Sequence, residues 1–256
     1  MPFHLCEAGV ERLDTLWLRG GFPLSFLADS DDESWRWRDG YIKTFLERDI
    51  PALGIRIPAL TLRRFWMMLA HYHGRQFNAS EIGKSLGVAD TTAGRYLDIL
   101  AGTFMVRRLA PWFENLRKRQ IKSPKIYFRD SGILHRLLGI PGMDQMVTHP
   151  KLGASWEGFA LEQIIRLSGV DQEETYFWGV HNQSELDLLL FIKGRRLGYE
   201  VKYTDTPRIT SSQKQALDHL RLESLTVVIP GAADYPLADK IHVLGLNRLG
   251  AMSYKP

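Results

Sequence analysis

The hydrophobic pattern changes its period partway along the chain, and this change constrains the fold more than any other feature of the sequence. Before residue 139 the apolar residues recur mostly at helical spacing, whereas most apolar runs after residue 168 are short and strand-like. Residues 139–153 contain proline and glycine and are predicted to form a linker. We therefore expect an α+β chain with a mainly helical N-terminal half and a C-terminal domain that contains a sheet.

Composition excludes several classes of protein. The chain has 256 residues, 45% of them hydrophobic, and no long polar tract, so it is predicted to be folded nearly throughout. Its one cysteine, Cys6, cannot form an internal disulfide. The longest apolar runs are far shorter than the roughly 20 residues that span a bilayer, and the N-terminus shows no charged segment followed by an apolar core, so we expect no secretion. We expect a cytoplasmic protein with no membrane partner.

Residues 61–140 carry the pattern of a winged-helix domain, preceded by a helical lead-in over residues 1–60. An amphipathic helix is predicted over residues 62–73. After it, Asn78 can cap a short helix, Gly87 can make a turn, and Asp90 can cap a second helix. The exposed start of this second helix is predicted to insert into the major groove of DNA with Thr91, Thr92 and Arg95.

Two other interpretations of this region are weaker. Gly83-Lys84-Ser85 resembles the end of a nucleotide-binding phosphate loop, but Asn78 stands where that loop has its first glycine and no apolar strand leads in. A winged helix can also be a protein-docking module that binds no nucleic acid.

The charge distribution favours nucleic acid. Formal net charge is only +4, yet residues 107–129 contain eight basic residues and one acid. Most of this segment is predicted to be a hairpin, with strands over residues 105–112 and 125–130 and a basic loop between them. The loop residues expected to contact DNA phosphates are Arg117, Lys118, Arg119 and Lys122. A solvated charged loop without a ligand is the alternative.

Residues 154–256 are predicted to form a second domain with the order αβββαβ. The pattern places a helix over residues 155–168 and another over residues 210–222. Strands are predicted over residues 175–180, 185–192, 197–203, 225–229 and 240–244. The middle strands form an antiparallel hairpin, and the second helix is a crossover that returns to the sheet.

Charged side chains gather on this predicted hairpin. Alternation puts Glu185, Asp187, Leu189 and Phe191 on one face of their strand and Glu200 and Lys202 on one face of the next. A turn at Lys193-Gly194 sets Asp187 opposite Glu200, whereas a turn at Gly194-Arg195 sets it opposite Lys202. In either register, two acids and a lysine lie together and can form a site for a divalent cation.

Glu157 is a fourth candidate. It precedes Ala160, Leu161 and Ile164 at helical spacing, so it lies on the buried stripe of its helix. A carboxylate on such a stripe is costly unless it meets a metal, a cation or hydrogen-bond donors. The structural alternatives are a helix-start carboxylate for Glu157 and a surface pair between Asp187 and Lys202.

These residues carry a resemblance to known families. Glu157, Asp187 and Glu200-Val201-Lys202 on an αβββαβ core resemble the restriction-endonuclease-like superfamily with its PD-(D/E)XK signature, and Gln213 matches a position that some members use. The whole chain also resembles the C-terminal region of a prokaryotic family of AAA+ ATPases. The stretches that carry this likeness are residues 18–23, 41–54, 122–132, 156–157 and 185–187.

The resemblance implies two functions. In the first, the chain binds DNA and hydrolyses phosphodiester bonds with Mg²⁺ or Mn²⁺: Asp187 and Glu200 ligate the metal, Glu157 serves a second metal or a water, and Lys202 positions water or stabilises phosphate charge. In the second, the chain is the non-catalytic DNA- or partner-binding region of an AAA+ ATPase. The chain itself has no Walker motif, so it resembles a fragment or a naturally split version of such a protein, and the partners expected are a separate ATPase chain or a second copy of this chain.

Overall fold

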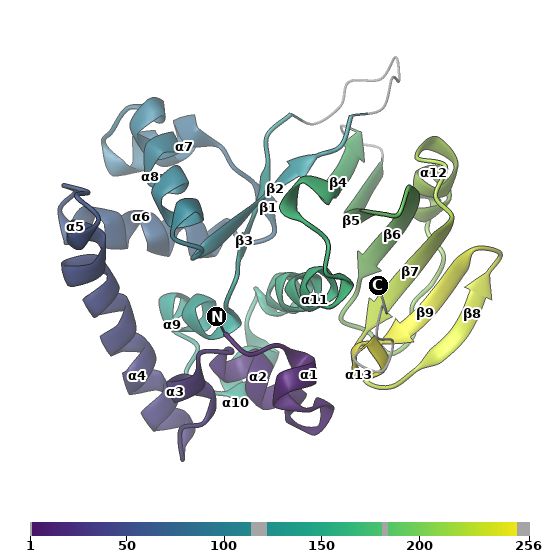
Figure 1. The fold of residues 1–256 in the computed structure, drawn as a ribbon, viewed down its shortest axis with the longest axis horizontal. Coiled ribbons are helices and arrows are strands. Elements are labelled where there is room, and N and C mark those ends of the chain that lie inside the picture. Colours follow the sequence, from purple (N-terminus) through teal and green to yellow (C-terminus); the bar gives the residue numbers. More distant parts are fainter. Residues whose placement is uncertain (1, 114–121, 181–183, 250–256) are drawn as a thin grey trace. The chain divides into compact units, whose positions relative to one another are not determined.

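The computed structural model describes residues 2–113, 122–180 and 184–249, and the chain forms two compact units. The first unit contains residues 1–108 and 126–155, and the second contains residues 109–125 and 156–256. Both helices and strands are present, as the sequence predicts (Figure 1). Two strands, β2 (Val106–Pro111) and β3 (Lys125–Phe128), and helix α11 (Leu152–Ser168) begin in one unit and end in the other.

The first unit is mainly helical. Its elements are α1 (Leu5–Ala8), η1 (Val10–Arg12), α2 (Leu13–Arg19), α3 (Pro23–Phe26), α4 (Asp31–Thr44), η2 (Phe45–Asp49), α5 (Ile50–Ala52), α6 (Ala59–His71), β1 (Arg75–Gln76), α7 (Ala79–Leu86), α8 (Asp90–Gly102), α9 (Ser131–Leu138) and α10 (Met143–Thr148). Helix α10 lies within residues 139–153, the segment predicted to be a linker. The helical lead-in is interrupted at Gly9, whose φ of 87° ends α1.

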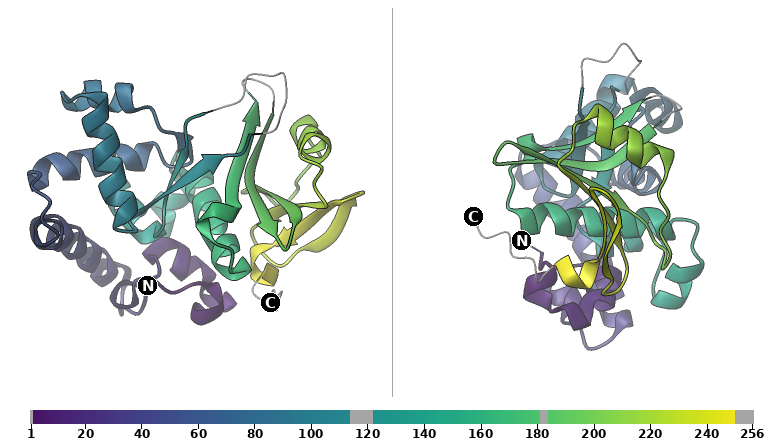
Figure 2. Two further views of the ribbon diagram at one scale, coloured as in Figure 1. Left: turned by 45° about the horizontal axis from the view of Figure 1, so that its top comes forward. Right: turned by 90° about the vertical axis from the view of Figure 1, so that its right-hand side faces the viewer.

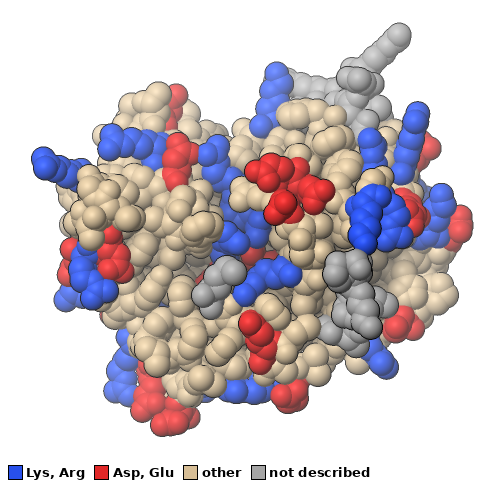
Figure 3. All heavy atoms as spheres, viewed as in Figure 1, with Lys and Arg blue, Asp and Glu red and all other residues tan. Residues whose placement is uncertain are grey.

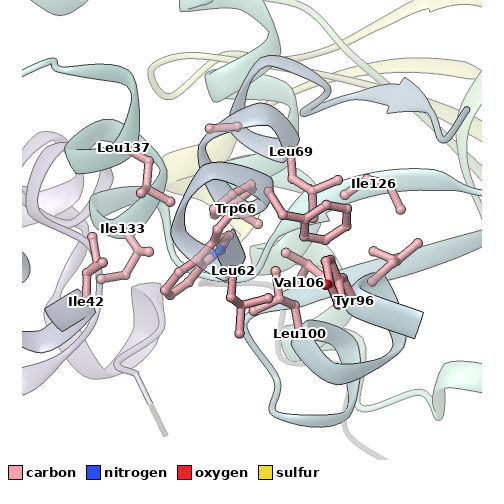
Figure 4. Packing of buried hydrophobic residues seen from close by; sticks show 14 of the residues in the cluster. Ile42, Leu62, Trp66, Leu69, Tyr96, Leu100, Val106, Ile126, Ile133 and Leu137 are labelled. Carbon is pink, nitrogen blue, oxygen red and sulfur yellow. The ribbon is translucent and has the colours of Figure 1, made fainter. Parts of the chain in front are cut away.

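One hydrophobic core holds this unit together. Ile42 of α4, Leu62 and Trp66 of α6, Leu100 of α8 and Ile133 of α9 are all buried in it (Figure 4). Residues 42–50 of the helical lead-in therefore share this core with the helices that follow. A full set of buried aliphatic and aromatic side chains of this kind is the main stabilising term of such a unit.

Asp130 fixes the start of α9 against an upstream loop. Its carboxylate accepts hydrogen bonds from the backbone N–H of Ile133 at 2.9 Å and of Gly21 at 2.8 Å. Asp130 is thus the N-cap of α9. Gly132 is required here, because a Cβ on it would lie 2.0 Å from the carbonyl oxygen of Arg19.

The second unit is built on a mixed sheet. After the last residues of β2 come η3 (Gln172–Glu174), β4 (Thr175–Val180), β5 (Ser184–Ile192), β6 (Arg195–Val201), α12 (Ser211–His219), β7 (Ser224–Ile229), β8 (Asp234–Ala238), β9 (Ile241–Gly245) and α13 (Leu246–Leu249). Strands β4, β5 and β6 are antiparallel neighbours, whereas β6, β7 and β9 pair in parallel.

Two helices cover opposite faces of this sheet. Figure 1 and the left view of Figure 2 show α11 on one side of strands β4–β6 and α12 on the other. On the α12 side, Ala216 and Leu220 pack with Leu186 and Leu225 in a buried cluster. The predicted αβββαβ order is confirmed, with one strand missed. That strand, β8, contains Pro236 and pairs only with β9, which is where proline is tolerated in a sheet.

Candidate functional site

A tight turn sets the register of the hairpin formed by β5 and β6. Ile192 pairs with Arg195, so the turn is Lys193-Gly194, with φ values of 51° and 79°. Leu188 pairs with Tyr199, and the same register places Asp187 opposite Glu200. The alternative turn at Gly194-Arg195 is wrong.

A bulge interrupts β5 at Asp187. Tyr176 of β4 pairs with Leu189, whereas Trp178 pairs with Leu186, so Asp187 and Leu188 together face the single residue Phe177. Alternation is broken there, and Leu186 and Leu189 pack in the same core cluster. The expectation that Leu189 and Phe191 share the face of Asp187 is therefore wrong, because a bulge adds one residue to the strand and re-aims the side chain.

Lys125, the first residue of β3, lies among three carboxylates. Its Nζ lies 2.5 Å from Oε1 of Glu185, 3.6 Å from Oε1 of Glu157 and 3.7 Å from Oδ1 of Asp187. The Lys125 side chain is 6% exposed, and those of Asp187, Glu157 and Glu185 are 12%, 21% and 45% exposed. Because water screens these charges only in part, the cation and the acids interact strongly.

Asp187 is held from two sides. Its Oδ2 accepts a hydrogen bond of 2.9 Å from the backbone N–H of Val201, and its Oδ1 is the oxygen near Lys125. Val201 lies between Glu200 and Lys202 in the chain, so this bond anchors Asp187 to the strand that carries the other two predicted site residues.

Glu200 and Lys202 form the second part of the site. The Nζ of Lys202 lies 2.7 Å from Oε1 of Glu200, whose side chain is buried. Oε2 of Glu200 is also buried and has no hydrogen-bond partner among the described residues. Burial, together with the negative charge of Asp187, raises the pKa of Glu200 to about 8 although Lys202 opposes the shift.

The neighbouring carboxylates favour the charged form of Lys202. Burial acts to lower the pKa of this ammonium, but the carboxylates of Glu200 and Asp187 outweigh burial and raise the pKa above its ordinary value. Lys202 therefore stays protonated at neutral pH and acts as a fixed positive charge beside the acids.

Glu157 lies on α11 as the spacing predicts. Ala160, Leu161 and Ile164 are completely buried, which confirms the apolar stripe, and Glu157 at its start is only partly exposed. Its charge adds to the upward pKa shift of Glu200. Glu157, Asp187, Glu200 and Lys202, which come from three elements, thus interact in one place.

Gln213 has a structural partner. Its Oε1 accepts a hydrogen bond of 3.0 Å from the backbone N–H of Thr210, and its own N–H donates to Oγ1 of Thr210 at 3.2 Å. This reciprocal capping box begins α12. The described contacts of Gln213 therefore explain its burial without a catalytic role.

Sequence reasoning missed two members of the site, Lys125 and Glu185. Lys125 was assigned to the basic segment, and no contact between it and the acids was predicted. The signal that could have revealed its role is its position at the start of the short apolar strand Lys125–Phe128. Glu185 was placed on the face of Asp187 but was given no role. Only the fold brings β3 and β5 residues together.

The acids do not by themselves form a ready metal site. Within residues 2–113, 122–180 and 184–249, no group of three or more His, Cys, Asp or Glu side chains is arranged to hold a metal ion. The donor chemistry still suits Mg²⁺, because carboxylate oxygens are its preferred protein ligands and the buried Oε2 of Glu200 has no partner in the described structure. Asp187, Glu200 and Glu157 are the residues that could hold such an ion.

The candidate DNA-reading helix is α8. Ala93, Leu97 and Leu100 are buried, whereas Thr91 and Arg95 are exposed and Thr92 is partly exposed, as predicted. Asn78 caps α7 by accepting from the N–H of Glu81, and Gly87 ends it with a φ of 70°. The N-cap of α8 is Ala89 and not Asp90, which begins the helix and accepts a hydrogen bond from the N–H of Thr91.

The basic segment is less exposed than its sequence suggests. Arg117, Lys118 and Arg119 lie outside the described residues, and Lys122 is exposed. Arg107 and Lys125 are buried, and Arg108 forms an ion pair with Asp98. Arg107 and Lys125 therefore do not belong to an exposed basic patch, whereas Arg108 is exposed. On the face seen in Figure 3, basic and acidic side chains are interspersed.

Comparisons with known proteins give two family matches. Residues 10–144 match the family described as "Domain of unknown function (DUF8612)", and residues 152–249 match "Domain of unknown function (DUF4143)". No solved structure matches the chain. No helix of the described segments is long and apolar enough to cross a membrane.

Two curated relatives are similar to most of this chain. An uncharacterized protein of Mycobacterium bovis and one of Mycobacterium tuberculosis are each 52% identical to it over 235 residues. The matched region is 92% of this chain and 53% of each relative, so the chain spans about half the length of the curated relatives it matches.

Proposed function

The chain belongs to the DUF8612 family, and from the geometry of its two units we propose that it is a DNA-binding protein with a nuclease-like site for Mg²⁺ or Mn²⁺. The observation that carries the proposal is the interaction of Asp187 with Glu200 and Lys202 across one hairpin. Two carboxylates and a lysine in this arrangement suit hydrolysis of a phosphodiester bond.

Each site residue has a distinct part in this proposal. A bound divalent ion polarises a phosphoryl group and makes water a better nucleophile. Asp187 and Glu200 hold the ion, and the hydrogen bond from Val201 keeps Asp187 in position. Lys202, whose raised pKa keeps it charged, orients the attacking water or stabilises charge on the phosphate.

The first unit supplies the helix that is proposed to read DNA. Its order of α6, β1, α7, α8, β2 and β3 supports a winged-helix interpretation, with Thr91, Thr92 and Arg95 at the exposed start of α8. Exposed threonine and arginine side chains at a helix N-terminus can contact base edges in the major groove. Arg117, Lys118, Arg119 and Lys122 are proposed to contact phosphates.

One observation favours a second candidate function. Lys125 already neutralises part of the acid cluster, as a structural ion network would. In that case the chain is the non-catalytic DNA- or partner-binding region of a split or truncated AAA+ ATPase.

A melting series with Mg²⁺ and Mn²⁺ tests the metal site. Because a ligand that binds only the folded state stabilises it by mass action, the parent protein should melt at a higher temperature as the metal concentration rises. Asp187→Asn removes a ligand, keeps the side-chain size and should abolish the rise. A melting temperature of the parent protein that no divalent ion changes would exclude the metal site and favour the second function.

A further inference from the structure

The position of Lys125 among three carboxylates indicates a role that the family resemblance does not assign to this residue. We propose that the Lys125 ammonium is the resident cation of the acid cluster and that a divalent ion enters only by displacing it, so that Lys125 sets the metal affinity. This inference rests on the proposed function for the presence of a metal site.

The contacts of Lys125 are those of a bound cation. Three carboxylate oxygens from α11 and β5 lie within 3.7 Å of its Nζ, and its side chain is almost fully buried. The same nitrogen lies 5.5 Å from the centre of the Phe177 ring, whose face also attracts cations. The fold therefore stabilises one positive charge at the position of the Lys125 ammonium.

A divalent ion and this ammonium exclude each other. An ion coordinated by Asp187 and Glu157 needs oxygen distances of about 2.0–2.6 Å, and those two carboxylates already face Lys125. Two cations this close repel strongly in a site that water screens weakly.

Lys202 does not have this role. Its side chain is 45% exposed and its ion pair joins Glu200 alone, so solvent can compensate it when a metal arrives. The buried Oε2 of Glu200, which has no partner among the described residues, is an oxygen that a metal can add to those of Asp187 and Glu157. Displacement of Lys125 exchanges one cation for another of higher charge.

Calorimetric titration of Mn²⁺ into the full chain tests the inference. Lys125→Gln should bind Mn²⁺ about tenfold more tightly or better, because the competing charge is gone. Lys125→Arg retains the charge and should keep the weak affinity of the parent. Lys214→Gln changes an exposed lysine of the same unit by the same charge and should leave the affinity unchanged. An unchanged affinity in Lys125→Gln, or an equal gain in Lys214→Gln, overturns the inference.

A second measurement needs no variant, in case Lys125→Gln does not fold. In the parent protein, an amine-reactive reagent followed by peptide mass spectrometry should label the buried Lys125 slowly without metal and faster with Mg²⁺. Labelling of Lys214 should not change. A rate at Lys125 that Mg²⁺ leaves unchanged or lowers contradicts displacement.

DNA cleavage separates this inference from the proposed function. Tighter Mn²⁺ binding by Lys125→Gln without cleavage by any variant supports the role of Lys125 and contradicts the nuclease. Metal-dependent cleavage by the parent, with the same Mn²⁺ affinity in the parent and Lys125→Gln, supports the nuclease and overturns the role of Lys125.

Discussion

The ammonium of Lys202 lies 2.7 Å from one carboxylate oxygen of Glu200, while the other oxygen of Glu200 is buried without a partner in the described structure. One oxygen of this carboxylate thus pairs with a positive charge, and the other has no partner in the described structure. A buried acid in this state is a source of instability unless it is protonated or meets a second cation. Its protonation can be followed through stability.

Glu200→Gln should change the pH dependence of stability. Burial and the charge of Asp187 raise the pKa of Glu200 from 4.5 to about 8, so the folded state binds more protons than the unfolded chain between these values. This residue therefore makes the parent less stable as the pH rises through that window. Above pH 8 the melting temperature of the variant should be higher than that of the parent. The variant should also lack the loss of stability that ionisation of Glu200 causes in the parent as the pH rises.

Melting temperatures of both proteins in EDTA, from about pH 4 to about pH 9, check this prediction. Glu173→Gln, at an exposed acid of the same unit, is the control and should follow the parent. If the melting temperatures of the parent and of Glu200→Gln change with pH in parallel, the pKa of Glu200 is not raised in the folded state.

A chain of buried hydrogen bonds in the first unit predicts a second pH effect. Nε1 of Trp17 donates to Oγ of Ser155, which lies 2.6 Å from Nε2 of His135, and Nδ1 of His135 lies 2.9 Å from the carbonyl oxygen of Leu18. Because a carbonyl only accepts, Nδ1 carries the proton and the neutral ring accepts from Ser155. Burial lowers the pKa of His135 to about 3.

His135→Ala should lower the free energy of unfolding by about 2–3 kcal/mol at neutral pH, because the Leu18 carbonyl and the Ser155 hydroxyl lose a partner. The parent's own contribution from His135 is complete above its unfolded pKa of 6.5 and is lost as the pH falls toward 3. The deficit of the variant should therefore shrink in acid. Urea unfolding at several pH values measures this, with the exposed His71→Ala as control; a deficit that is constant with pH contradicts it.

Arg95 is predicted to contact duplex DNA. The double variant Thr91→Ala and Arg95→Ala removes exposed polar groups at the start of α8 and should weaken binding by about 1–3 kcal/mol. Fluorescence anisotropy with a labelled duplex measures the affinity. Lys84→Ala removes one exposed charge from α7 and should bind as the parent does. Equal losses in both variants would indicate a general charge effect.

The basic loop should set the salt dependence of DNA binding. Replacing Arg117, Lys118, Arg119 and Lys122 with alanine should reduce the slope of log affinity against log salt by up to about 3.6, since each lost phosphate contact removes about 0.9. Binding titrations at several salt concentrations give the slope. An unchanged slope would show that phosphates are contacted elsewhere.

Local sequence signals predicted much of the fold because local physics determines those parts. Gly87 ends α7 in a left-handed conformation and Lys193-Gly194 makes the hairpin turn, as glycine positions indicate. The same hairpin register brought Asp187 and Glu200 together. Strand β8 was missed because Pro236 is atypical of a strand and is accepted here only at the sheet edge.

The rest of the site depends on nonlocal structure. The bulge at Asp187 changes which residues share a face, and no residue type marks it in advance. Lys125 lies 32 residues before Glu157 and 62 before Asp187, so only the packing of β3 near α11 and β5 reveals that it neutralises the acids. Burial also separates Lys125 from the exposed Lys122, although both belong to one basic segment.

The central claim is that the second unit hydrolyses DNA with a divalent metal, and a cleavage assay tests it most directly. Labelled single-stranded, duplex and branched DNA should be incubated with the parent protein in Mn²⁺, in Mg²⁺ and in EDTA, beside Asp187→Asn. We predict metal-dependent cleavage of at least one substrate by the parent and none by the variant. No cleavage by the parent with either metal, or cleavage that persists in Asp187→Asn, would contradict the nuclease function.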